Sequence, residues 1–149
     1  MPRIERHANV VWEGNLARGT GRISAGTGAF SDLHYSIAVR VGKGTEGKTS
    51  PEELLAAAHA GCYATSLAGE LTQAGTPPER LDITSNVVMD EVAGQGHVIV
   101  ESQLRVRASV AGMDDDAFRR VVVEADQGCS FSKLIKASAK VSIDAELEV

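Results

Sequence analysis

Positive charge is not in excess in this sequence. The 149 residues include 15 Lys and Arg against 20 Asp and Glu, for a net charge of −5. Because neutralising a phosphate backbone requires a basic face, this balance argues against nucleic acid as a partner. The chain also lacks an apolar run of the roughly 18 residues that a membrane span needs, and charges interrupt its first 14 residues where a signal peptide would be apolar. We therefore expect a cytoplasmic protein with no membrane partner.

Cysteine is scarce, with Cys62 and Cys129 as the only two. Two thiols are too few for a secreted disulfide framework or a cysteine metal cluster. The four histidines show no metal-ligand spacing either: His7, His34, His59 and His97. We expect no metal and no cofactor. In a reducing cytoplasm both cysteines would be free thiols, and burial as small inert hydrophobes is the alternative to a chemical role.

Linkers, repeats and low-complexity segments are also absent from the sequence, so we predict a single domain over residues 1–149. Residues 4–13 and 19–25 predict two short strands around a glycine-containing turn. Alternation in residues 33–42 predicts a third strand. Its apolar positions would share one face: Leu33, Tyr35, Ile37, Val39 and Val41. Arg40 would then point to the opposite face.

A long helix is predicted by residues 49–75, "TSPEELLAAAHAGCYATSLAGELTQAG". Ser50 can cap it, Pro51 suits the first helical position, and Glu53 completes a capping box. Gly75, which precedes two prolines, is expected to end it. The body carries no charge between Glu53 and Glu70, so we expect it to be buried on most sides.

Small residues recur every four positions along this helix: Ala57, Gly61, Thr65 and Gly69. Such a ridge would let a second helix approach closely, and close packing on a sheet would explain it as well.

The remaining sequence predicts two long strands, two helices and a last strand. In order, these cover residues 81–92, 97–112, 114–128, 130–137 and 140–149. The first of the two helices is acidic at its N-terminal end, as the helix dipole favours, and has four apolar residues facing inward: Phe118, Val121, Val122 and Ala125. The order β-β-β-α-β-β-α-α-β indicates an α+β fold in which an antiparallel sheet packs on helices.

The two thiols have different helical settings. Cys62 lies too deep in its helix to benefit from the N-terminal dipole, so a reactive thiolate there would need a nearby cation. Arg18 and Arg40 are the candidates, although either could be a solvated surface charge. Cys129 directly precedes a short helix, where thiol pKa values fall. The settings suit a nucleophile with a resolving partner. A rival interpretation pairs Cys62 with His59, three residues earlier, as nucleophile and base.

Four stretches of the sequence resemble the OsmC/Ohr family of thiol-dependent hydroperoxide reductases, specifically its OsmC branch. The most specific is "TSPEELLAAAHAGCYATSL" at residues 49–67. The others are "VVWEGNLARGTGRIS", "HYSIAVRV" and "GCSFSKLIKA", so the resemblance covers essentially the whole chain in order. One position departs from the family pattern: Ser130 follows the second cysteine, where the family often has proline.

The resemblance implies that Cys62 is the peroxidatic cysteine and Cys129 the resolving one. The Cys62 thiolate would become a sulfenic acid, Cys129 would condense with it to a disulfide, and a dithiol reductant of lipoyl or thioredoxin type would regenerate the pair. Arg18 and Arg40 match the arginines of the family's active-site region. Glu52 matches the glutamate ten residues before the nucleophile.

The resemblance further implies an OsmC-like fold with an antiparallel sheet packed on a long central helix, in an intertwined homodimer with shared active sites. Organic hydroperoxides are the expected substrates, with hydrogen peroxide as another. Glu52 and Cys62 are about 15 Å apart along a straight helix, so a Glu52 that orients an arginine at the thiol must come from a second chain, or the helix must break near Gly61. The competing functions are a Cys–His hydrolase or transferase using Cys62 and His59, and a non-catalytic binding domain.

Overall fold

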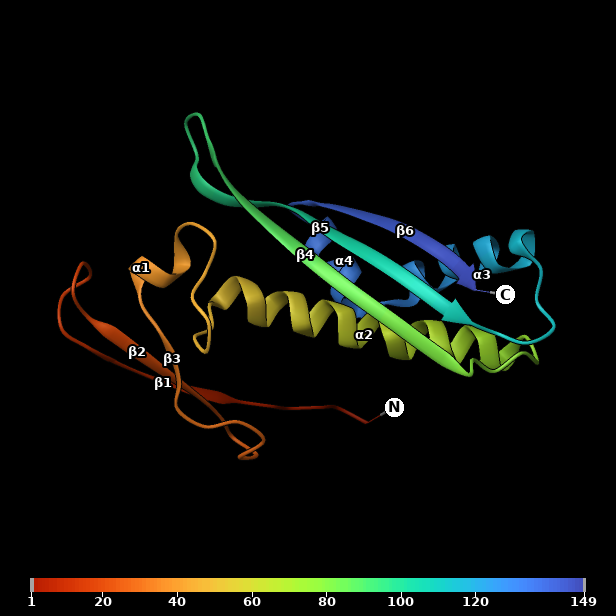
Figure 1. Ribbon diagram of the computed structural model, residues 1–149, viewed down its shortest axis with the longest axis horizontal. Coiled ribbons are helices and arrows are strands. Elements are labelled where there is room, and N and C mark those ends of the chain that lie inside the picture. Colours follow the sequence, from red (N-terminus) through yellow and green to blue (C-terminus); the bar gives the residue numbers. More distant parts are fainter. Residues whose placement is uncertain (1, 149) are drawn as a thin grey trace. The chain divides into compact units, whose positions relative to one another are not determined.

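The structure, a computed structural model, describes residues 2–148. Its chain divides into two compact units, Met1–Leu54 and Leu55–Val149, and each unit contains one three-stranded sheet (Figure 1). The expectation of a single domain over residues 1–149 stays a prediction.

The first sheet has the strand order β1-β2-β3, with both pairs antiparallel. Its strands are β1 (Ala8–Glu13), β2 (Thr20–Ala25) and β3 (Leu33–Tyr35). Gly21 pairs with both Trp12 and Tyr35, whose ring centroids are 5.7 Å apart. A Cβ at Gly21 would come within 2.2 Å of the Tyr35 ring, so only glycine permits these two aromatic side chains to close over the middle strand.

The predicted third strand ends earlier than expected. After Tyr35 the chain forms a short helix, α1 (Ile37–Arg40), so the strand prediction for residues 33–42 is wrong beyond its first third. The cause is Ser36, whose Oγ accepts a hydrogen bond from the Val39 N–H at 3.3 Å and caps a helical turn. Arg40 is therefore the last residue of a helix and not a strand residue.

The long helix α2 (Pro51–Gln73) confirms the predicted cap at Ser50 and the end at Gly75, whereas the Glu53 side chain accepts from the Thr49 hydroxyl at 3.0 Å and does not complete the predicted capping box. The Glu53 N–H donates to Ser50 Oγ at 3.1 Å. At the other end, Gly75 adopts a left-handed conformation with φ of 80°, and the Thr76 N–H reaches the Leu71 carbonyl at 3.0 Å. This is the Schellman arrangement that glycine makes possible.

Burial of α2 differs from the expectation, because only one of its faces is buried. That face consists of His59, Tyr63, Leu67 and Leu71. The small-residue ridge lies elsewhere: Ala57, Gly61 and Thr65 are exposed, and a Cβ at Gly61 would meet nothing within 4 Å among the described residues. Packing on the sheet of the same chain therefore does not explain the ridge. A single sheet can cover only one side of a helix. The prediction that α2 is buried on most sides is therefore wrong within a single copy of the chain.

The second unit joins a mixed sheet to helices. Its strands are β4 (Arg80–Val92), β5 (Gly96–Ser109) and β6 (Lys140–Glu148), and its remaining helices are α3 (Asp115–Gly128) and α4 (Ser130–Lys136). The α+β class is confirmed. The expected antiparallel pairing holds for β4 and β5, whereas β6 runs parallel to β5 because α3 and α4 form a crossover between them.

The core of the second unit lies between this sheet and its helices, which cover one face of the sheet (Figure 1). In the second half of β5 every second residue is buried, as the alternation predicts: Ser102, Leu104, Val106 and Ala108. The four predicted inward residues of α3 are buried as well. Leu67 of α2 is completely buried among them.

Replacing Leu67 with alanine should lower the free energy of unfolding by about 2–5 kcal/mol, because the lost methyl groups leave a cavity in a close-packed core. Leu134→Ala is the matched control, since Leu134 is 66% exposed where Leu67 is 0% exposed. Denaturant unfolding of both variants checks this, and equal losses would contradict the assigned core.

Candidate functional site

Cys62 lies near the middle of α2 and is half-buried. Its thiol is adjacent to the Cys129 thiol and to the backbone N–H groups of Phe131 and Ser130, all three of which influence its pKa. All three partners belong to the segment where α4 begins. The side chain of Cys62 therefore faces the start of a helix that lies about 70 residues further along the chain.

Cys129 is the N-cap residue of α4, which confirms its predicted position at a helix start. Its side chain is 0% exposed, and its Sγ accepts a hydrogen bond from the Ser132 N–H at 3.5 Å. The two thiols are thus neighbours in space although they lie 67 positions apart in the sequence. Both are free, so the pair is a dithiol of which Cys62 is the more accessible member.

Burial is the largest influence on the Cys62 thiol and raises its pKa above the ordinary value of 9.0. The adjacent Cys129 raises this pKa further, and the N–H groups of Phe131 and Ser130 oppose the increase only in part. The thiol is therefore protonated near neutral pH in the surroundings that the second unit provides. This agrees with the expectation that the uncharged helix needs a cation from elsewhere to form a thiolate.

Two hydroxyl groups of α2 fix the end of α3 next to Cys129. The Tyr63 hydroxyl donates to the Val122 carbonyl at 3.0 Å, and Ser66 Oγ donates to the Ala125 carbonyl at 2.7 Å. The Cys129 N–H donates to the Asp126 carbonyl and not to the Ala125 carbonyl, which is its usual partner in a helix. The hydrogen bond from Ser66 therefore satisfies a carbonyl that the helix leaves free.

His59 is completely buried one helical turn before Cys62. Its Nδ1 is 2.7 Å from Ser102 Oγ and its Nε2 is 2.8 Å from Ser132 Oγ. Ser85 Oγ extends the chain of hydroxyls at 3.0 Å from Ser102 Oγ. Both ring nitrogens are engaged by serines and neither by Cys62, so the geometry disfavours the rival Cys–His nucleophile–base pair.

Neither serine was recognised as a site residue from the sequence. Ser102 did give a signal, because it is a polar residue at a buried position of an otherwise apolar alternating strand. Ser132 gave none, since its contact with His59 depends on how α4 packs on α2.

The first unit contains the other predicted site residues. Glu52, in the first turn of α2, binds the Arg40 guanidinium through two nitrogens: Nη2 is 2.5 Å and Nε 3.2 Å from Oε1. Burial is the largest influence on Glu52 and raises its pKa, but the hydrogen bonds and charge of Arg40, together with hydrogen bonds from the Glu52 backbone and from Ser50, outweigh it and the net shift is downward. Arg40 is thus a half-buried cation held by a carboxylate, and the alternative of a free surface charge does not apply to it.

Arg18 has a different setting. It lies in the turn between β1 and β2, where its backbone N–H donates to Asn15 Oδ1 at 2.9 Å. Its side chain is exposed and forms no ion pair within residues 2–148. The structure therefore brings Arg40 together with Glu52 and Cys62 together with Cys129, and it leaves Arg18 without a partner among these residues.

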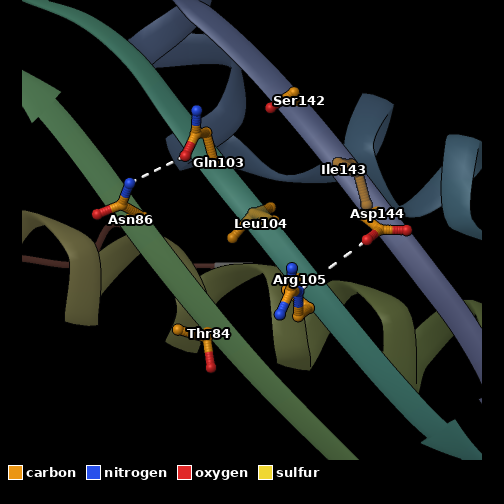
Figure 2. Close-up of a pocket in the computed structure, with 8 residues that line it drawn as sticks. All are labelled: Thr84, Asn86, Gln103, Leu104, Arg105, Ser142, Ile143 and Asp144. Atoms are coloured by element: carbon orange, nitrogen blue, oxygen red, sulfur yellow. Dashed lines mark hydrogen bonds and ion pairs between the residues drawn. The ribbon is translucent and has the colours of Figure 1, made fainter.

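A separate depression of about 540 Å³ lies on the sheet of the second unit and is lined by residues of β4, β5 and β6 (Figure 2). Asn86 and Gln103 are hydrogen-bonded across it at 2.9 Å, and Arg105 points toward Asp144 (Figure 2). These side chains are exposed and alternate with the buried residues that face the helices. The depression contains neither a thiol nor a histidine, so it is no candidate for the thiol chemistry.

Clusters of three or more potential metal ligands do not occur among the described residues. In the same part of the chain, the helices are too short or too polar to cross a membrane.

Burial is the main reason why the pKa of His59 lies below its ordinary value of 6.5. The charge of Asp126 opposes this lowering of the pKa, and the charge of Lys136 adds to it. The unfolded chain therefore binds a proton at His59 more readily than the folded chain, so the stability should be highest above pH 6.5 and fall as the pH drops below it. His59→Gln should reduce this loss. Urea unfolding at about pH 7.5 and about pH 5.5 measures it, on either side of the ordinary histidine pKa. Equal losses in both proteins would contradict a neutral buried His59.

Comparisons with known proteins agree with this arrangement. The family described as "OsmC-like protein" matches residues 42–144. The curated protein named peroxiredoxin OsmC of Escherichia coli strain K12 is 33% identical over 145 residues, which cover 97% of this chain and 98% of that protein, and the protein of the same name from Shigella flexneri matches equally.

Solved structures show the same fold. A Legionella pneumophila structure titled as an organic hydroperoxide resistance protein OsmC superposes with a TM-score of 0.72 at 20% identity, covering 98% of this chain and 99% of that one. An organic hydroperoxide resistance protein from Elizabethkingia anophelis gives a TM-score of 0.74 at 16% identity, covering 99% and 100%. The family match and the 33% identity over nearly the full length place this chain in the OsmC family.

Proposed function

We propose that the protein is a thiol-dependent peroxidase that reduces organic hydroperoxides, and also hydrogen peroxide, through Cys62 and Cys129. The observation that carries this function is the proximity of the two thiols at the core of the second unit. Peroxide reduction by a dithiol needs one accessible nucleophile and one partner within bonding reach. The half-buried Cys62, with the buried Cys129 beside it, supports these two roles.

The reaction proceeds in three balanced steps. The Cys62 thiolate attacks the distal oxygen of the hydroperoxide, the O–O bond breaks, and the alkoxide leaves as an alcohol after taking up a proton, so that Cys62 becomes a sulfenic acid. The Cys129 sulfur then attacks the Cys62 sulfur, forms the disulfide and releases water. A dithiol reductant of lipoyl or thioredoxin type exchanges with the disulfide, becomes oxidised itself and restores both thiols.

The names of the relatives support this class of reaction. The Escherichia coli protein is named a peroxiredoxin, and the two solved structures are named for organic hydroperoxide resistance. The apolar composition of α2 around Cys62 favours organic over inorganic hydroperoxides as substrates. Free thiols at both positions suit a reducing compartment, and we propose a cytoplasmic location.

Arg40 is the proposed source of the charge that Cys62 lacks. Its guanidinium is oriented by Glu52, and Arg18 has no comparable support. A cation beside the sulfur would lower a thiol pKa that burial raises. We assign Arg18 a supporting role in the same electrostatic environment.

We further propose that the Arg40–Glu52 pair acts on Cys62 of a second chain in a homodimer. The helix α2 runs without a break through Gly61, so Glu52 and Cys62 of one chain remain about 15 Å apart along it. That distance leaves a partner chain as the source of the pair. The exposed ridge of Ala57, Gly61 and Thr65 supports the same conclusion, because small residues permit close helix contact.

Cys62→Ser should abolish peroxide consumption, because it removes the nucleophile. Cys129→Ser should permit one oxidation at Cys62 but leave the sulfenic acid exposed to further oxidation and impair turnover. Mass spectrometry after one equivalent of cumene hydroperoxide distinguishes sulfenic acid, disulfide and over-oxidised products. Normal multiple turnover by Cys62→Ser would overturn the assignment, and wild-type protein in which both thiols survive the peroxide would favour a non-catalytic domain.

Action in trans is tested by co-expressing a Glu52→Ala chain with a Cys62→Ser chain under different affinity tags. The heterodimer should recover activity that both parental homodimers lack, because one of its two sites has both residues intact. Glu52→Ala combined with Cys62→Ser in one chain, against a wild-type partner, is the matched control, because it carries the same two substitutions and should be inactive if Glu52 acts in trans. A heterodimer as inactive as its parents would show that Glu52 and Cys62 act within one chain.

A further inference from the structure

The buried histidine of α2, His59, has no role in the proposed reaction. One of its hydrogen-bond partners, Ser132, nevertheless contacts Cys129. An imidazole that is 0% exposed is costly unless its nitrogens are hydrogen-bonded, and both of them are, to Ser102 and Ser132. A core filled by an apolar side chain would avoid this cost altogether. The question is therefore what the hydrogen bonds of His59 hold in place.

Hydrogen counting fixes the direction of these bonds. Within residues 2–148 the Ser132 hydroxyl has only His59 Nε2 as a partner, and Ser132 is 0% exposed. Its proton must therefore be donated to Nε2, since no other acceptor is in reach. The ring proton is then on Nδ1 and is donated to Ser102 Oγ, and Ser102 donates in turn to Ser85. In this arrangement every buried proton has an acceptor.

Ser132 connects this network to the second thiol. Its hydroxyl donates to His59 Nε2 at 2.8 Å, while its backbone N–H donates to Cys129 Sγ at 3.5 Å. His59 and Cys62 are three residues apart on the same rigid helix. A path therefore runs from Cys62 through His59 and Ser132 to Cys129, and the proximity of the two thiols closes it.

We propose that His59 is a positioning residue which, through Ser132, holds the Cys129 thiol against Cys62 for disulfide formation. This inference rests on the proposed function for its place in the reaction. The need for such a restraint follows from α4, which has only seven residues and is too short to keep its first turn in place by itself. Ser130 follows Cys129 directly, so the backbone there is not stiffened by proline.

The restraint acts on the effective concentration of one thiol toward the other. Disulfide formation requires the two sulfurs to approach along one line, and a loosened Cys129 would spend less time in that geometry. A buried hydrogen bond contributes about 1 kcal/mol, which corresponds to about a fivefold to tenfold change in that effective concentration. Oxidation of Cys62 by peroxide forms no bond to Cys129. Because Cys129 raises the pKa of Cys62, a loosened Cys129 should not slow this step.

The first test uses glutathione and needs no peroxidase activity. In a buffer of reduced and oxidised glutathione, the two protein thiols and one glutathione disulfide exchange for the protein disulfide and two reduced glutathiones. Acid quenching and mass spectrometry then give the effective concentration. Ser132→Ala should lower it about fivefold to tenfold, whereas Ser102→Ala, which removes an equally buried hydroxyl from the other nitrogen, should change it less than about twofold.

A second pair of variants keeps the test decisive if Ser132→Ala does not fold. The amide of a glutamine reaches the position of Nε2 and can keep the bond to Ser132, whereas the shorter asparagine amide reaches only the position of Nδ1. His59→Gln should therefore remain close to wild type, and His59→Asn should lose as much as Ser132→Ala. Equal effects of both members in each pair, or no effect in either, would overturn the positioning role and leave a purely structural network.

Single-turnover oxidation with cumene hydroperoxide then separates the two steps. His59→Asn should not lower the second-order rate of Cys62 oxidation, and it should prolong the dimedone-reactive sulfenic acid about fivefold to tenfold. Slowing of both steps would count against positioning. If wild-type protein forms the disulfide with glutathione but does not react with peroxide, the proposed peroxidase function is wrong and the positioning role stands on the glutathione result.

Discussion

The contact between the buried face of α2 and the segment from α3 to α4 is the interaction on which the site depends. Three consecutive turns of α2 contribute hydrogen bonds to this contact. His59 is hydrogen-bonded to the Ser132 hydroxyl, Tyr63 to the Val122 carbonyl and Ser66 to the Ala125 carbonyl. Apolar packing alone is non-directional, so it would allow α2 to shift along α3 and α4. The hydrogen bonds have direction, so they fix the register in which Cys129 meets a sulfur on the same helix.

The separate roles of apolar packing and of hydrogen bonding explain why the buried face of α2 is apolar but not purely aliphatic. Leu67 and Leu71 provide burial, while the polar atoms of His59, Tyr63 and Ser66 satisfy carbonyl and hydroxyl groups that would otherwise be buried without partners. A single polar substitution in such a contact costs more than its own bond, because the remaining partner loses water as well.

Local signals in the sequence predicted the elements whose ends are set by nearby residues. The caps of α2, the alternation of β5 and the position of Cys129 at a helix start are of this kind. Predictions failed where a distant or competing contact decides. Ser36 caps a helical turn where the alternation predicts the end of a strand. The parallel pairing of β6 depends on a crossover that no short motif encodes. The proximity of Cys62 to Cys129 is likewise a product of packing across 67 positions of the sequence.

The protonated state of Cys62 follows from the same packing and has a chemical consequence. Burial places the thiol against its partner and also raises its pKa, so the arrangement that prepares the disulfide suppresses the nucleophile. A thiol of this kind gains reactivity only where a cation is brought to it. No charged residue lies between Glu53 and Glu70 of α2, whereas the Arg40–Glu52 pair belongs to the first unit. The proposed chemistry therefore requires a cation that the helix around Cys62 does not supply.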